Sequence, residues 1–223
     1  MATQGATPER NGRRGRGSQA RTRLARAAVV QAAGRLFLER GYGATTMEAI
    51  SDLADVPSAT VYRLFSSKSG ILKALLDVSI AGDDQEIPVA ERPDVQSLRA
   101  EPDPARQLAG FVTVTAQVNA RVAPLYRMLV SAAGTDPDAT ALLDELTSQR
   151  QQGQRMIARA LARAGALRPE LRERDASDVI HALMSPEIYR LLVIDRGWKP
   201  ERYRRWLTET LAHQLLPPSQ PPV

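Results

Sequence analysis

The chain has 223 residues and no cysteine, and 43% of its residues are hydrophobic although only 4% are aromatic. This length allows one or two domains, and the absence of cysteine excludes disulfides, thiol nucleophiles and cysteine-ligated zinc. Residues 1–82 carry 12 Lys and Arg against 6 Asp and Glu, whereas residues 83–223 carry 18 against 19. A basic N-terminal part on a near-neutral remainder indicates a nucleic-acid-binding module joined to a second domain.

The apolar residues predict an all-α protein. No sustained alternation of apolar and polar residues predicts a strand, and the core is expected to consist mainly of Ala, Leu, Val and Ile. No apolar run approaches the ~18 residues of a membrane span, and the arginine-rich N-terminus lacks the apolar core of a signal peptide. We therefore expect a cytoplasmic protein.

Residues 1–19 contain the segment GRRGRGS and no apolar side chain that could anchor them. This composition predicts a disordered basic arm. Its arginines are compatible with a solubilising tail, with an arm that contacts DNA phosphates or the minor groove, and with a short RNA-binding segment.

Residues 20–82 are predicted to form a DNA-binding domain. A helix over residues 21–40 carries an apolar stripe and ends at Gly41. Thr45-Thr46-Met47-Glu48 predicts a capping box, in which a Thr oxygen accepts an amide N–H and Glu48 reaches back. Met47, Ile50 and Leu53 are expected to face inward.

Ala54-Asp55 then forms a tight turn, and Pro57-Ser58 starts a second short helix whose inward residues are Val61 and Phe65. Two short helices with almost nothing between them cannot form a separate core, and this arrangement is typical of a helix-turn-helix. Ser67-Lys68 caps the following helix. Its free amides, its dipole and the Lys68 ammonium favour a phosphate there, although a Ser cap can be only a cap.

The remainder is expected to be helical after a linker or mobile loop at residues 83–103. Helices are predicted over 104–122, 124–133, 135–164, 176–196 and 200–216, with Pro186 bending the fourth. Residues 104–216 would form one helical ligand-binding and dimerisation domain, and residues 217–223 a frayed tail.

Residues 26–76 closely resemble the DNA-binding domain of the tetracycline-repressor (TetR) family. The resemblance rests on RAAVVQAAGRLFLERGY, on TTMEAISDLADV, and on the later segments Thr60-Val61-Tyr62, Phe65 and Ser67-Lys68-Ser69. The chain departs from the family pattern with Asp55 in place of Gly, Pro57 in place of Ser and Ala59 in place of Gly. Asp tolerates the left-handed conformation better than most residues, so the turn is expected to survive.

The resemblance implies a set of DNA contacts in the major groove. Thr46 and Lys68 would hold phosphates, Tyr62 would contact a phosphate and the backbone, and Arg63 suits guanine, although it could also be solvated or contact a phosphate. The full set is Thr46, Ser58, Ala59, Thr60, Tyr62, Arg63 and Lys68.

The resemblance also implies a homodimer and a pocket for a small molecule. The terminal helices would supply the dimer interface, or would simply close the monomer core; the expected interface residues are Ile180, Leu183, Met184, Ile188, Leu191, Trp206, Leu207 and Leu211. The pocket candidates, each of which could also be ordinary core, are Phe111, Thr115, Val118, Asn119, Tyr126, Met128 and Leu129. An apolar, aromatic or mildly polar effector is expected, and nearby arginines leave an anionic one open.

The most consistent interpretation is a repressor whose dimer binds a palindromic operator and is released by a small molecule. A regulator without a small-molecule inducer, acting as an activator or through a protein partner, is the alternative, and an enzyme is a remote one. The two histidines, His181 and His213, lie in different segments without metal-ligand spacing. No catalytic residue, metal or cofactor is predicted.

Overall fold

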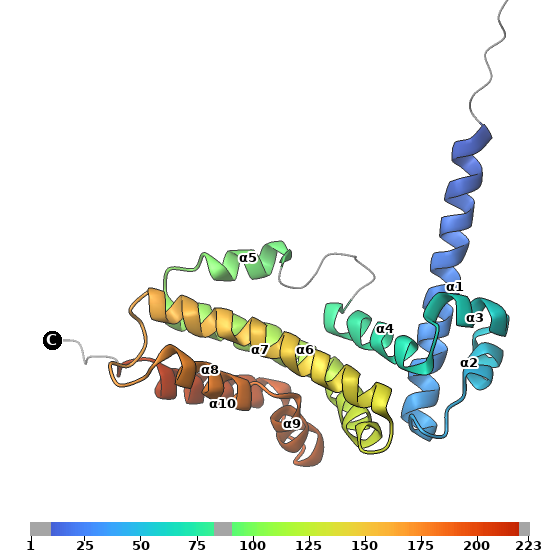
Figure 1. The fold of residues 1–223 in the computed structure, drawn as a ribbon. Coiled ribbons are helices and arrows are strands. Elements are labelled where there is room, and N and C mark those ends of the chain that lie inside the picture. Colours follow the sequence, from blue (N-terminus) through green and yellow to red (C-terminus); the bar gives the residue numbers. More distant parts are fainter. Residues whose placement is uncertain (1–9, 83–90, 219–223) are drawn as a thin grey trace, which may run out of the picture. The chain divides into compact units, whose positions relative to one another are not determined.

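The computed structural model describes residues 10–82 and 91–218, and within these ranges every regular element is helical (Figure 1). The all-α prediction is confirmed. The chain divides into two compact units after Leu75, rather than after residue 82 as predicted. Helix α4 (Lys68–Ala81) runs without a break through this point, so it contributes residues to both units.

In the first unit, α1 (Arg10–Arg40) ends at Gly41, whose φ of 81° stops the helix. Its predicted apolar stripe is buried: Val29, Val30, Ala33, Leu36 and Phe37. The prediction of disorder over residues 1–19 is wrong for residues 10–19, which are helical, whereas residues 1–9 lie outside the described ranges. These residues extend a helix that its packed half has already nucleated, so each added residue costs little, although Gly12, Gly15 and Gly17 are poor helix formers.

Helices α2 (Met47–Ala54) and α3 (Ser58–Phe65) follow α1 and pack against it (Figure 1). Met47, Ile50, Val61 and Phe65 are buried as predicted. Leu53 is 43% exposed, so its inward assignment is wrong. In so short a helix only one narrow face meets α1, and the last turn already points away from it.

The second unit begins within α4 and continues with α5 (Pro93–Arg99). This helix lies inside the segment predicted to be a linker, so that prediction is wrong for residues 93–99; residues 83–90 lie outside the described ranges. Val95 anchors α5 by burial, and the Gln107 side-chain amide donates to the carbonyls of Leu98 (3.1 Å) and Arg99 (3.3 Å). These bonds satisfy carbonyls that a helix end leaves open.

Helix α6 (Pro104–Ala133) is one continuous helix, where two were predicted. Pro124 lies inside it. An interior proline costs about 3 kcal/mol through its lost hydrogen bond and its ring clash. Ala123, Leu125 and Tyr126 on either side are buried, and we attribute the continuity of the helix to their packing.

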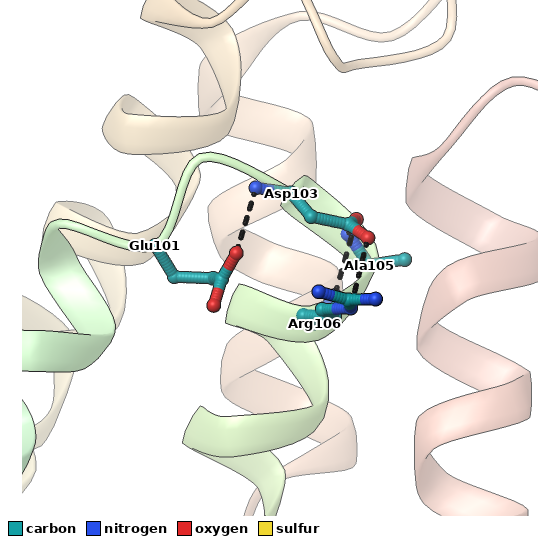
Figure 2. Close-up of polar contacts among 4 residues, drawn as sticks. All are labelled: Glu101, Asp103, Ala105 and Arg106. Atoms are coloured by element: carbon teal, nitrogen blue, oxygen red, sulfur yellow. Dashed lines mark hydrogen bonds and ion pairs between the residues drawn. The ribbon is translucent and has the colours of Figure 1, made fainter.

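The first turn of α6 is capped by Asp103, as Figure 2 shows. Its carboxylate accepts from the amides of Ala105 (2.9 Å) and Arg106 (3.3 Å) and pairs with the Arg106 guanidinium at 3.4 Å. The Asp103 amide itself donates to Glu101 at 3.1 Å. This arrangement fixes where α6 begins.

Helices α7 (Pro137–Arg163), α8 (Glu173–Leu183) and α10 (Pro200–Leu215) pack with α6 around the core of this unit (Figure 1). The bent helix predicted over residues 176–196 is instead broken into α8, α9 (Pro186–Tyr189) and the π-helical segment η2 (Arg190–Asp195). Ser185 caps α9, so Pro186 begins a new helix rather than bending an old one. The buried Asn119 amide donates to the carbonyls of Met184 (3.2 Å) and Ser185 (3.4 Å) at the break.

The end of α10 is joined to the loop that follows α7. The Arg168 amide donates to the Leu215 carbonyl at 2.9 Å, and its guanidinium donates to the His213 carbonyl at 2.9 Å. Gly165, with φ of 64°, turns the chain into this loop. Two backbone acceptors of the last helical turn are thereby satisfied from a distant part of the sequence.

Candidate nucleic-acid interface and internal cavity

The turn between α2 and α3 is built on Asp55, whose φ of 52° and ψ of 42° place it in the left-handed region. The departure from glycine is therefore accommodated as predicted. The Ser51 hydroxyl donates to the Val56 carbonyl at 2.6 Å and lies 3.0 Å from the Ser58 hydroxyl. These bonds fix the angle at which α3 leaves the turn.

Helix α3 separates its residues into a packed face and a polar face. Val61 and Phe65 are buried, and the Arg26 guanidinium lies 4.7 Å from the centre of the Phe65 ring. The predicted DNA-contact residues of this helix fall on the other side: Ser58, Ala59, Tyr62 and Arg63 are exposed, and Thr60 is half-buried. The structure thus brings these five residues onto one accessible surface.

Tyr62 is linked to the preceding helix through Glu48. Its hydroxyl donates to a Glu48 carboxylate oxygen at 3.2 Å, and the negative charge of Glu48 raises the pKa of Tyr62 above its usual value. The predicted capping box is wrong in its second half. Thr46 accepts from the Ala49 amide at 3.1 Å, but Glu48 sits one position too early to return a bond to the cap and contacts Tyr62 instead.

Lys68 is held by the loop between α1 and α2. Its ammonium donates to the carbonyls of Tyr42 (2.9 Å) and Thr45 (3.1 Å) and lies 4.2 Å from the centre of the Tyr42 ring. An ammonium has three N–H donors, and these bonds use two of them. Beside it, the Ser67 hydroxyl accepts from the Gly70 amide at 3.1 Å and so caps α4 as predicted. The two carbonyl bonds of Lys68 were not predicted, because they join residues 23 and 26 positions apart.

The sequence of this unit matches a known family. Residues 29–75 match the sequence profile described as bacterial regulatory proteins, tetR family. Over 168 residues the chain is 30% identical to the uncharacterized HTH-type transcriptional regulator YdeS of Bacillus subtilis. These residues make up 74% of this chain and 77% of YdeS. The chain belongs to the tetR family. It is therefore a DNA-binding transcriptional regulator.

Other tetR-type proteins resemble the chain over different lengths. The HTH-type transcriptional regulator TtgR of Pseudomonas putida is 40% identical over 52 residues, which are 23% of this chain and 25% of that protein. The crystal structure of native NalD, the secondary repressor of the MexAB-OprM multidrug efflux pump in Pseudomonas aeruginosa, has a TM-score of 0.67 at 22% identity and covers 87% of this chain and 97% of that one. This likeness shows that the tetR-type fold extends through both units.

The second unit of this tetR family member contains a cavity of about 650 Å³. Of the predicted ligand-contact residues, five line it: Phe111, Thr115, Val118, Asn119 and Tyr126. Met128 and Leu129 do not line the cavity, because the side of α6 that faces it carries Val122 and Tyr126. Leu129 is fully buried elsewhere in the core.

Helix α7 contributes a wall of the cavity that was not predicted from the sequence. Arg150, Gly153, Gln154 and Ile157 line it at three- and four-residue steps. This periodicity is visible in the sequence, but three of these residues are polar or lack a side chain, so the apolar pattern alone could not reveal them.

The predicted dimer residues fall into two groups. Ile180, Met184, Leu207 and Leu211 are at most 1% exposed within one subunit, so they belong to its core and cannot contact a partner; their interface assignment is wrong. Leu191 is 43% exposed, and Leu183, Ile188 and Trp206 are half-buried. Core and interface positions follow the same helical period, so sequence periodicity does not separate them.

Within residues 10–82 and 91–218, no helix is long and apolar enough to cross a membrane. The same residues contain no cluster of His, Asp and Glu that could hold a metal ion.

Proposed function

We propose that this regulator is a repressor whose dimer binds a palindromic operator and releases it when a small molecule occupies the cavity. The observation that carries the proposal is the course of α4. Its first turn, which begins at Lys68 and is capped by Ser67, belongs to the helix-turn-helix unit, whereas Leu76 and Ile80 further along the same helix line the cavity. A ligand that changes the setting of α4 would therefore act directly on the DNA-binding unit.

The proposed DNA contacts follow from the polar face of α3. Arg63, an exposed guanidinium, would read a base edge in the major groove, and Ala59 and Thr60 would lie beside it. Thr46, Ser58, Tyr62 and Lys68 would contact the sugar-phosphate backbone and set the register of the helix. The basic charge of residues 1–82 favours DNA of any sequence, so base discrimination rests on few residues.

A dimer is proposed because one helix-turn-helix reads only a few base pairs. Two copies related by a two-fold axis add their contacts on half-sites about one helical turn apart. Leu183, Ile188, Leu191 and Trp206 are the remaining candidates for the contact between subunits. The repressor NalD, with a similar fold, supports assigning repression rather than activation.

The test begins with isolating the genomic DNA fragments that the protein binds and measuring its mass in dilute solution. A fragment with two inverted half-sites and a mass of twice 24.4 kDa are expected. A thermal-shift screen of metabolites then supplies ligands, and each hit is titrated against the protein with and without operator. Linkage is reciprocal: if the ligand lowers the affinity of the protein for the operator by some factor, the operator lowers the affinity of the protein for the ligand by the same factor.

Equal ligand affinity with and without operator would exclude release by that ligand. If no metabolite that binds also releases DNA, a regulator controlled by a protein partner becomes the better description. A mass of 24.4 kDa in the absence of DNA would contradict the dimer.

A further inference from the structure

The charged residues that line the cavity are all of one sign. Among the residues of 10–82 and 91–218, its wall contains Arg99, Arg150, Arg159 and Arg163, and no Asp or Glu. Most of the remaining wall is apolar, with neutral polar residues such as Thr115, Asn119 and Gln149. A cavity of this composition repels cations and offers an anion several guanidinium groups next to apolar surface.

Arg150 differs from the other three because it is half-buried, whereas they are exposed. Arg159 also pairs with Glu173 at 3.3 Å. Arg163 lies 13 positions further along α7 than Arg150, a distance of about 20 Å along a helix at about 1.5 Å per residue. Arg150 is therefore the arginine placed to meet a group inside the cavity.

The guanidinium of Arg150 is held in place by His181. One terminal nitrogen donates to the His181 carbonyl at 3.0 Å and the other lies 3.0 Å from His181 Nε2. The Nε atom of Arg150 is buried, and it has no hydrogen-bond partner among the residues that the structure describes. A buried N–H donor without an acceptor is costly, so an incoming acceptor would be favoured there.

His181 orients Arg150 without neutralising it. Its Nδ1 lies 2.6 Å from the Gln154 side-chain carbonyl oxygen, which can only accept, so Nδ1 carries the proton and Nε2 accepts from Arg150. Burial first, and then the charge of Arg150, lower the pKa of His181, which agrees with a neutral ring. The full positive charge of Arg150 thus stays available to a ligand.

The acids that act on this cluster from outside the cavity wall are Glu187 and Asp178, which are both exposed. Burial, and after it the charge of Glu187, raises the pKa of the cavity residue Tyr126. The charges of Glu187 and Asp178 oppose the lowering of the His181 pKa. No ion pair within 4.0 Å joins Arg150 to Glu187 or to another acid in residues 10–82 and 91–218. Among the described residues, Arg150 therefore has no close counter-ion.

We infer that the effector is an amphiphilic anion, with an apolar body in the cavity and a carboxylate or similar acid bound by Arg150. The inference rests on the proposed function, since it assigns the chemical class of the proposed effector. Phe111, Val118 and Ile157 supply apolar surface for the body of such a molecule. A planar carboxylate accepts paired hydrogen bonds from a guanidinium, and such charge-assisted bonds are stronger than neutral ones.

The test compares probes that share an apolar body and differ in charge: decanoate, 1-decanol and decyltrimethylammonium. Binding to the full-length protein is measured by calorimetry below the concentrations at which these probes form micelles. Decanoate is expected to bind at least about tenfold more tightly than decanol, because one hydrogen-bonded pair of charged groups changes the affinity by about that factor. Arg150→Gln should remove this preference while leaving decanol binding within about twofold.

Arg155→Gln is the matched control, because it removes the same charge from an exposed position of α7 outside the cavity wall. It should leave the preference for decanoate unchanged. Arg150→Lys, which keeps the charge but loses the planar fork, should retain part of the preference and also shows whether the site tolerates substitution. Equal binding of decanoate and decanol by the wild type, tighter binding of the cation, or no binding of decanoate would each overturn the inference.

The same preparation separates this inference from the proposed function. Decanoate that binds through Arg150 but leaves operator binding unchanged would uphold the anion site and count against ligand-driven release. Decanol that binds and releases operator as well as decanoate does would uphold release and refute the anion site.

Discussion

The Tyr62 hydroxyl of α3 donates to the Glu48 carboxylate of α2 at 3.2 Å, so the surface proposed to meet DNA carries a negative charge beside a proposed phosphate contact. In the free protein this bond orients the Tyr62 ring. In a DNA complex the same carboxylate would repel the neighbouring phosphates.

Glu48→Gln should therefore strengthen DNA binding about twofold to tenfold, similarly for operator and scrambled duplexes, and should lower the pKa of Tyr62 toward its usual value. Fluorescence anisotropy measures the affinities, and the ultraviolet absorbance of tyrosinate follows the titration. Glu39→Gln, which removes the same charge from α1, is the control. Weaker binding by Glu48→Gln would mean that orienting Tyr62 outweighs the repulsion.

Lys68→Met should act on stability and on DNA binding together. Loss of the bonds to the Tyr42 and Thr45 carbonyls should lower the free energy of unfolding by about 1–3 kcal/mol. If the third N–H meets a phosphate, affinity for all sequences falls alike and the slope of log K against log salt becomes shallower by about 1. Arg23→Met, an exposed change in α1, provides the comparison. A change in base preference, or an unaltered slope, would contradict the phosphate contact.

Asp55→Gly should stabilise the helix-turn-helix unit by about 0.5–1 kcal/mol. Glycine adopts the observed φ of 52° without the steric cost that a side chain adds there, and this outweighs the extra entropy of the unfolded chain. Asp55→Val should destabilise it by at least about 1 kcal/mol, because a β-branched residue fits that conformation poorly. Urea denaturation followed by circular dichroism measures both. If glycine proves no more stable than Asp, local bonding by the Asp side chain compensates for the strain.

His181 should make stability fall on acidification. Its pKa is lowered in the folded protein, mainly by burial, so the unfolded chain binds more protons as the pH drops below about 6.5. The free energy of unfolding is therefore highest above that pH, and it decreases as the pH falls from about 6.5 toward the lowered pKa of His181. His181→Gln should show a shallower loss of thermal stability between about pH 7.5 and about pH 5.5 than the wild type. His213→Gln is the control, and equal slopes for wild type and His181→Gln would refute the assignment.

The helix-turn-helix could be predicted from the sequence because each of its parts has a local cause. Gly41 ends a helix, Thr46 and Ser67 cap helices, and Asp55 accepts a left-handed turn, and all four act within a few residues of chain. What could not be predicted is where side chains meet across distance. The Glu48–Tyr62 and Lys68–Tyr42 contacts depend on how three helices pack, which no local pattern encodes.

The second unit was predictable in its helices and less so in its surfaces. Pro124 and Pro186 have the same local chemistry, yet α6 continues through the first and the chain breaks at the second. The difference lies in the polar groups at hand: Ser185 before Pro186 caps a new helix and Asn119 satisfies the carbonyls at the break, whereas Ala123 before Pro124 has no side chain that could cap one. Arg150 was overlooked for a similar reason, because only the fold shows that its charge faces a cavity.

The bonds from Arg168 to the carbonyls of His213 and Leu215 have a practical consequence for anyone who tags or shortens this chain. Removing the last turn of α10 would take away both carbonyls to which Arg168 donates, so the loop that follows Gly165 would lose these two bonds to α10. A C-terminal affinity tag should therefore leave α10 intact, and a truncation at Ala212 is expected to raise proteolytic cleavage around residues 164–171.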